Sequence, residues 1–274
     1  METIASGYQL AEAPVATDDG GVAFSDVLGG GVRAWSPATG AVVDVVAKRR
    51  GIGGMARHAD GGLVMSGRDI VHVRAGESRT VYAPPEGVAG LNDLTVDPEG
   101  RVVVGQLRFR PFAGEAPVPG EAVVVAADGS TTVALDGIEW ANGCAFSPDG
   151  RTLYLCDYHR GVVVAADRRD DGSYGPSRVV VTSPSGAADG MAVDEVGALW
   201  VALGPRGTVG RFTPDGVLDT ELVVPAAFVA SLCFGGADGR DLFVTTAQGA
   251  DGTPGAVLRT RVDGPGAPVG AVTI

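Results

Sequence analysis

The sequence is poor in basic, cysteine and aromatic residues, and has no long apolar run. Among its 274 residues Lys48 is the only lysine, and the formal net charge is −12. Phosphate backbones and anionic membranes repel such a chain, so we expect no nucleic-acid partner and no membrane partner. No segment reaches the roughly 18 apolar residues of a membrane-spanning helix, and residues 1–10 do not have the pattern of a signal peptide. We therefore expect a cytoplasmic protein; the sequence does not indicate its oligomeric state.

The three cysteines exclude a disulfide framework. Cys144, Cys156 and Cys233 are odd in number, form no C-x-x-C motif and stand among apolar residues. We interpret them as core thiols in a reducing compartment. The chain also lacks a G-x-S-x-G motif, so nothing in it supports a serine hydrolase.

Glycine and proline, by contrast, are abundant, with 43 and 17 residues. Glycine destabilises helices and proline breaks their hydrogen-bond ladder, so long helices are disfavoured. Because 45% of the residues are hydrophobic, the chain can still bury a core. This composition favours many short strands joined by tight turns.

One short pattern recurs six times along the chain. A small or acidic residue precedes a glycine, and one or two residues later an apolar strand-like run begins. The repeats are spaced by about 40–50 residues, which is typical of propeller blades. The six turn glycines are Gly20, Gly61, Gly100, Gly150, Gly197 and Gly239.

The segments between these turns complete each repeat. Asp-Gly sequences favour tight hairpins, and each hairpin is followed by a third strand such as GVVVAADR and an outer segment such as VLDTELVVP. The sequence therefore predicts an all-β fold, a six-bladed β-propeller with four-stranded antiparallel blades, forming a single domain over 1–274. The third blade carries a proline-rich insertion at 107–120, which we interpret as a loop and a candidate lid.

Polar residues stand at a fixed distance from the turn glycines. Eight residues before them lie, in chain order, Glu12, Gly53, Asn92, Asn142, Asp189 and Ser231. In a propeller the innermost strands place such equivalent positions around one end of the central channel. Two carboxylates and two amides make a hard-oxygen donor set suited to a divalent cation. Asparagine and aspartate before glycine also form turns, which is the alternative explanation. No His or Cys enters the set, which argues against a thiolate-type zinc site.

These residues resemble the senescence-marker-protein/gluconolactonase/luciferin-regenerating family, which includes regucalcin. The matching stretches are Glu12-Ala13-Pro14, Asn92-Asp93, the segment NGCAFSPDGRTLYLCD at 142–157, DGMAVDEVGALWVA at 189–202 and SLCFGG at 231–236. The resemblance implies a six-bladed fold with one divalent metal ion near the channel mouth. It implies Glu12, Asn142 and Asp189 as metal ligands, with Asn92 beside them touching water or substrate. We expect Ca²⁺ as first choice, with Mg²⁺, Mn²⁺, Zn²⁺ and iron as alternatives.

The sequence departs from this pattern near Asn92. Sugar-lactonase members have R-x-N-D-G, whereas here Gly90 replaces the arginine and Leu94 the glycine. Met55 and Leu94 would make the mouth more apolar, which disfavours a sugar lactone. Arg108, on the third-blade loop, is a candidate to supply the missing donor. Trp140 and Ser231 are further candidate substrate contacts.

The resulting hypothesis is metal-assisted hydrolysis of a small lactone. Asp189 and Asn92 are the candidate catalytic residues, with Asp189 as base, although a metal-bound carboxylate is a weak base. Two alternatives stay open. One is a same-fold enzyme acting on organophosphates or in specialised metabolism, and the other is a non-catalytic binding propeller stabilised by a cation.

Overall fold

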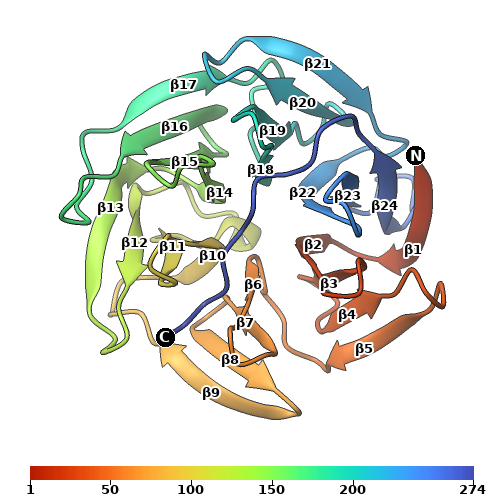
Figure 1. The fold of residues 1–274 in the computed structure, drawn as a ribbon, viewed down its shortest axis with the longest axis horizontal. Helices are drawn as coiled ribbons and strands as arrows, with labels where there is room; N and C mark the ends of the chain where they lie inside the picture. The colour runs from red at the N-terminus through yellow and green to blue at the C-terminus, as the bar shows by residue number, and fades with distance from the viewer. The chain divides into compact units, whose positions relative to one another are not determined.

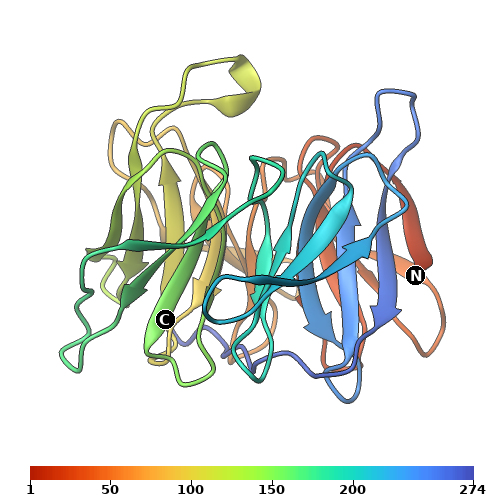
Figure 2. The ribbon, with the colours of Figure 1, turned by 90° about the horizontal axis from the view of Figure 1, so that it is seen from above.

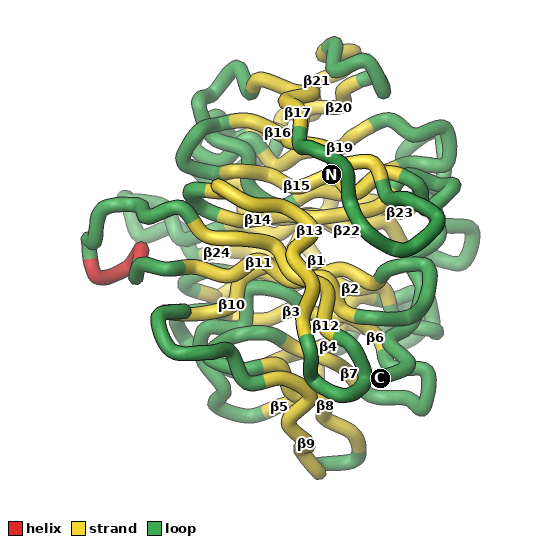
Figure 3. The backbone as a smooth tube through the Cα atoms, turned by 90° about the vertical axis from the view of Figure 1, so that its left-hand side faces the viewer, coloured by secondary structure: helices red, strands yellow, loops and turns green.

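Antiparallel β-sheet accounts for almost all regular structure in this chain. The structure is a computed structural model that describes residues 1–274, and its only helical segment is the 3-10 turn η1 (Pro111–Ala113) (Figure 3). Twenty-four strands form six four-stranded sheets. The sheets are the blades of a six-bladed β-propeller, which confirms the predicted fold class. No helix is both long enough and apolar enough to cross a membrane.

The chain divides into two compact units of three blades each. The first unit comprises Met1–Ile52 and Asp189–Pro268, and the second Gly53–Ala188 and Val269–Ile274. The blades of the first unit are β2 (Ala11–Ala16), β3 (Val22–Asp26), β4 (Val32–Trp35) and β5 (Val42–Val46); β18 (Met191–Val193), β19 (Leu199–Ala202), β20 (Thr208–Phe212) and β21 (Leu218–Val223); and β1 (Glu2–Tyr8), β24 (Gly255–Arg261), β23 (Asp241–Thr246) and β22 (Val229–Gly235).

The second unit contains the three blades in the middle of the sequence. They are β6 (Met55–Arg57), β7 (Leu63–Met65), β8 (Ile70–Arg74) and β9 (Glu77–Tyr82); β10 (Gly90–Val96), β11 (Val102–Leu107), β12 (Gly120–Val125) and β13 (Thr131–Ile138); and β14 (Ala141–Phe146), β15 (Thr152–Asp157), β16 (Val162–Asp167) and β17 (Arg178–Thr182) (Figure 1).

The six turn glycines all lie in hairpins between the first and second strands of a blade. Each has a positive φ, between 69° at Gly150 and 89° at Gly61. This backbone conformation is strained for residues with a Cβ atom, which explains why the repeat pattern is visible in the sequence. At Gly100 the amide N–H donates to the carbonyl of Asp97 over 2.9 Å and closes the turn.

The N-terminal strand has a role that the repeat pattern did not predict. β1 pairs antiparallel with β24, with Thr3 opposite Leu258, and so supplies the outer strand of the last blade. The first and last strands of the chain therefore share one sheet within the first unit.

The hydrophobic core consists of layers between neighbouring blades. Both faces of the middle strands are covered, so β11 and β23 are buried along their whole length. This burial on two faces explains continuous apolar runs such as VVVGQL. In the second unit, Val272 is fully buried in one such layer, and the tail is fixed where the Val272 N–H donates to the carbonyl of Arg57 over 2.8 Å.

Candidate functional site

The first unit brings together three of the predicted site residues on neighbouring inner strands. Glu12 is the second residue of β2, Ser231 the third of β22, and Asp189 lies two residues before β18. β22 packs beside both β2 and β18. The N–H of Gly190 donates to the carbonyl of Ala230 over 2.8 Å, which joins the segment carrying Asp189 to the strand carrying Ser231.

Gly190 is needed for this close approach. A Cβ atom built on it would lie 2.1 Å from Ser231 Oγ and 2.5 Å from Ser231 Cα. Glu12 is held by its own backbone, because the N–H of Ala13 donates to Glu12 Oε2 over 2.7 Å. Ala13 has a φ of 51°, which is uncommon for a residue other than glycine and often marks a functional site.

The second unit brings together the two amides. Asn92 on β10 donates through Nδ2 to the carbonyl of Ala141 over 2.9 Å, directly before Asn142 on β14. On its other side, Asn92 lies against Gly53, where a built Cβ would be 2.1 Å from Asn92 Oδ1. Gly53 is the equivalent of Asn92 in the preceding blade, and its missing side chain leaves the space that the Asn92 amide occupies.

The inner strands share an irregularity at these residues. In β2, β10 and β14, the inner strand has one residue more than its partner strand over a short stretch. The extra residue lies between Glu12 and Val15 in β2, between Leu91 and Leu94 in β10, and between Ala141 and Cys144 in β14. Such β-bulges re-aim side chains and are common beside active sites. The sequence contained a signal for them, because Ala13-Pro14, Asn92-Asp93 and Asn142-Gly143 are poor strand formers.

The oxygen donors that the two units contribute are of the kind that binds a hard cation. Glu12, Asn142 and Asp189 each expose 6% of their surface and offer carboxylate or amide oxygens. Burying carboxylates is costly unless hydrogen bonds or a cation compensate them. Oxygen ligands of this kind are those that Ca²⁺ and Mg²⁺ take in proteins.

Asp93, next to Asn92, is a further buried acid. Its Oδ2 has no hydrogen-bond partner, and burial raises the pKa of Asp93 to about 7. Asp93 also contributes, after burial itself, to the raised pKa of the Cys144 thiol.

The apolar residues predicted at the mouth are buried. Leu94 packs in the layer between β6–β9 and β10–β13, with Ala56, Val64 and Leu91. Met55 exposes 7% of its surface on β6. This placement makes Leu94 a packing residue, so the contribution of Leu94 and Met55 to substrate contact stays a prediction.

Trp140 lies in an aromatic group two residues before Asn142. Its ring makes an edge contact with Phe109, centroids 5.6 Å apart, and a tilted contact with Tyr158 at 4.7 Å. Phe109 is buried and anchors the loop between β11 and β12, which extends beyond the strands of its blade (Figure 2).

Arg108 begins this loop at the end of the blade where β10 starts. Its Nη2 donates to Glu121 Oε1 over 2.5 Å, and its Nη1 lies 3.7 Å from a Cβ built on Gly87. Gly90 itself is open, because the nearest atom to its built Cβ is the Gly67 carbonyl oxygen at 3.9 Å. Arg110, further along the loop, is engaged instead by Glu115.

Comparison with known proteins identifies the family. A sequence profile of the SMP-30/gluconolactonase/LRE-like region matches residues 10–248. The chain belongs to this family. Pentonolactonase XacC from Haloferax volcanii is 30% identical over 266 residues, 94% of this chain and 89% of the relative. Regucalcin from Xenopus laevis is 29% identical over 256 residues, 89% and 85% of the two chains. A solved luciferin-regenerating enzyme shares the fold with a TM-score of 0.88 at 23% identity, over 100% of this chain and 99% of that one.

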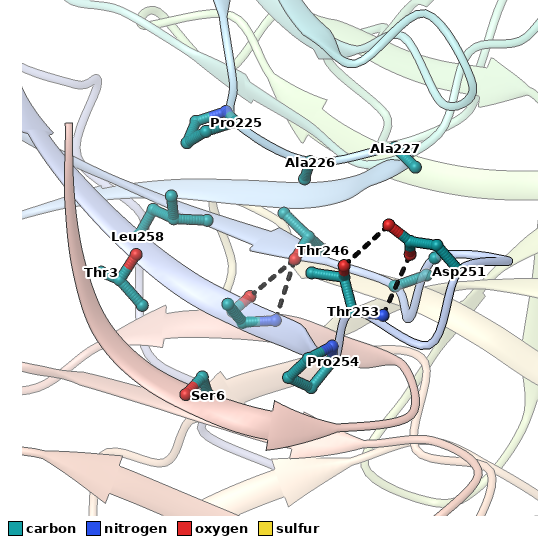
Figure 4. A pocket seen from close by; sticks show the side chains of 13 residues that line it. Thr3, Ser6, Pro225, Ala226, Ala227, Thr246, Asp251, Thr253, Pro254 and Leu258 are labelled. Carbon is teal, nitrogen blue, oxygen red and sulfur yellow. Dashed lines mark hydrogen bonds between the residues drawn. The ribbon is translucent and has the colours of Figure 1, made fainter.

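One pocket of the first unit lies away from the residues that carry the resemblance to the SMP-30/gluconolactonase/LRE-like family. It has a volume of about 410 Å³ and is lined mainly by small residues of β1, β24 and the segments 225–227 and 246–254 (Figure 4). Its carboxylate, on Asp251, accepts hydrogen bonds from the N–H and hydroxyl of Thr253 at 3.0 and 2.9 Å. Thr246 Oγ1 is likewise bonded to the backbone of Ala256. The pocket contains none of the predicted site residues.

Proposed function

We propose that this protein is a divalent-metal-dependent lactonase that opens a small lactone by hydrolysis. The observation that carries the proposal is the set of buried oxygen donors at repeat-equivalent positions of the inner strands, in a chain of this family. Relatives named as lactonases, such as the pentonolactonase from Haloferax volcanii, support the reaction class.

In this proposal Glu12, Asn142 and Asp189 hold the cation, with Asn92 next to them. The equivalence of these positions in the blade repeat and the family resemblance support the grouping. The chemistry supplied by a bound divalent cation is polarisation of the lactone carbonyl and a lower pKa for a water molecule. Ca²⁺ is our first choice because every donor is oxygen.

The protein's own residues then direct the proton and the carbonyl. Asp189 accepts a proton from the attacking water, whose oxygen bonds to the carbonyl carbon. The acyl carbon–oxygen bond of the ring breaks, the leaving alkoxide takes the proton back from Asp189, and a hydroxy acid leaves with Asp189 restored to its carboxylate form. Asn92 orients the substrate with the part of its amide that the Ala141 carbonyl does not engage.

Arg108 is our candidate for recognising hydroxyl groups of the substrate. It provides a guanidinium group near the segment that precedes β10, where Gly90 lacks the arginine of sugar lactonases. A planar guanidinium with several donors suits this role better than a lysine. Trp140 and Ser231 complete the proposed substrate contacts.

A metal-controlled hydrolysis assay tests the proposal. Protein stripped with EDTA should be inactive toward a panel of aliphatic and sugar lactones, and Ca²⁺, Mg²⁺ or Mn²⁺ should restore turnover. Asp189→Asn should lower kcat/KM about 100-fold or more, since it removes both a ligand charge and the base. Asp215→Asn, the same change at an exposed turn of the same unit, should have no effect. Metal-independent turnover, or hydrolysis of a phosphotriester with no lactone accepted, would reject the proposal.

A further inference from the structure

Two buried aspartates occupy equivalent places in different blades. Asp26 ends β3 and Asp157 ends β15, and they expose 5% and 0% of their surface. In the register of the sheets, Asp26 is opposite Ala11 and Asp157 is opposite Ala141. Each carboxylate therefore lies across from the residue directly before a proposed metal ligand, Glu12 or Asn142.

Asp157 binds the backbone that leads into β14. Its Oδ2 accepts the N–H of Glu139 over 3.0 Å, and its Oδ1 accepts the N–H of Trp140 over 3.1 Å and that of Arg160 over 3.4 Å. The N–H of Tyr158 donates to the Trp140 carbonyl over 2.9 Å. Three of these hydrogen bonds fix Glu139 and Trp140, the two residues before the strand, to the end of β15 and the turn that follows it, and the bond from Arg160 closes the turn itself.

Asp26 makes the same arrangement in the first unit. It accepts the N–H groups of Gln9, Leu10 and Gly29 over 3.4, 3.2 and 3.0 Å. The N–H of Val27 donates to the Leu10 carbonyl over 2.9 Å, as Tyr158 does to Trp140. The repetition of this pattern before two different ligand-bearing strands indicates a shared task.

The blade that carries Asn92 lacks the aspartate. Gln106 stands opposite Leu91 in β10, and its Nε2 donates to the hydroxyl of Tyr82 instead. Asn92 is held from the next blade, by the Ala141 carbonyl. The segment that Asp157 fixes therefore determines the position of both amides, Asn142 directly and Asn92 through one hydrogen bond.

We propose that Asp157 is a positioning residue for Asn142 and Asn92, and that Asp26 is the corresponding residue for Glu12. This inference rests on the proposed function, because the aspartates are proposed to position residues that bind the cation. Neither aspartate touches the cation or the substrate. Groups that orient metal ligands typically change metal affinity 10–100-fold when they are removed.

Asp157→Asn is the decisive variant, because its amide can accept at one oxygen only and presents an N–H₂ group to the other backbone N–H. The experiment is calorimetric titration of the EDTA-stripped full chain with CaCl₂, combined with hydrogen exchange of residues 139–142 and urea unfolding. We expect Asp157→Asn to weaken Ca²⁺ binding about 10–100-fold and to speed exchange in that segment.

Asp97→Asn is the matched control. Asp97 is a buried carboxylate of the same unit that accepts the N–H groups of Glu99 and Arg101 over 3.0 and 2.8 Å, but in the turn between β10 and β11. The Asp97→Asn variant should be less stable than wild type, whereas its Ca²⁺ affinity should stay within about twofold of the wild-type value. Asp26→Asn should weaken Ca²⁺ binding as Asp157→Asn does. If Asp157→Asn does not fold, Asp26→Asn tests the proposal in its place.

The outcomes separate the two proposals. If the wild-type chain binds no divalent cation, the proposed function fails and the positioning role fails with it. If the wild type binds Ca²⁺ and both Asp157→Asn and Asp26→Asn bind it equally well, only the positioning role is overturned. An equal loss of Ca²⁺ affinity in Asp97→Asn would also overturn it, because general destabilisation would then explain the effect.

Discussion

Gly53 provides a direct test of how Asn92 is held. A Cβ on Gly53 would lie 2.1 Å from Asn92 Oδ1, so an alanine forces the amide to move by more than about 1 Å to reach ordinary van der Waals contact. That movement breaks the hydrogen bond from Nδ2 to the Ala141 carbonyl. Gly53 does not have a positive φ, so alanine brings no backbone strain of its own.

The expected stability change can be worked out from these contacts. Losing the hydrogen bond costs about 1 kcal/mol, and up to about 3 kcal/mol where the carbonyl is left buried and unpaired. Alanine recovers about 0.4–1 kcal/mol, because it restricts the unfolded chain more than glycine does. We therefore expect Gly53→Ala to lower the free energy of unfolding by about 1–2 kcal/mol and to lower kcat/KM about as much as Asn92→Ala does.

A double-mutant cycle separates this effect from general damage. Shortening Asn92 to alanine removes the clashing atom, so Gly53→Ala in that background should raise the free energy of unfolding by about 0.4–1 kcal/mol. The coupling between the two positions should therefore equal the lost hydrogen bond, about 1–3 kcal/mol. Urea unfolding followed by tryptophan fluorescence measures all four proteins. Gly264→Ala is the control, because its built Cβ has no neighbour closer than Glu195 Oε1 at 3.9 Å. Coupling below about 0.5 kcal/mol would show that Asn92 is not seated against Gly53.

Two other predictions follow from the loop and from the buried acid. Arg108→Gln should raise KM for hydroxylated lactones about tenfold and leave KM for aliphatic lactones unchanged. Arg110→Gln is the control, because Arg110 lies further along the same loop, and it should change neither KM. Steady-state kinetics on both kinds of lactone would contradict us if the two variants behaved alike. Burial raises the pKa of Asp93 to about 7 from an unfolded value near 4, so its contribution to stability is present below pH ~4 and is lost as pH rises toward 7, by on the order of 1 kcal/mol per unit. Urea unfolding in EDTA at pH 5 and pH 7 measures the free energy of unfolding, which should fall more between the two pH values in wild type than in Asp93→Asn. An equal fall in the two proteins would refute the prediction.

Much of the fold could be predicted because its turns require glycine. The six turn glycines have positive φ, and each separates the first two strands of a blade. The place of β1 could not be predicted in this way, because an outer strand without its own turn glycine carries no repeat signal. Its partner, β24, lies at the other end of the sequence.

The candidate site was partly predictable for a related reason. Counting from the turn glycines found Glu12, Asn142 and Asp189, which are all buried in the structure. The aspartates that hold the backbone before the ligands were not found, because Asp26 and Asp157 look like ordinary residues at the end of a strand. Their function depends on hydrogen bonds to N–H groups 16–18 residues away in sequence, and no local pattern reports such bonds.

The spacing of eight residues between the donor position and the turn glycine has a physical basis. The repeats differ in length by several residues, yet the distance from the donor position to the turn glycine is constant. The start of the inner strand is packed closely against its neighbour, as the contacts of Gly53 with Asn92 and of Gly190 with Ser231 show. An inserted residue there would therefore displace a neighbouring blade's side chain. Insertions are therefore accepted in exposed connections, such as the loop between β11 and β12. The same close packing seats Asn92 against Gly53 and Ser231 against Gly190, each in the preceding blade. We therefore expect the glycines at 53 and 190 to be as necessary to the proposed site as the side chains they accommodate.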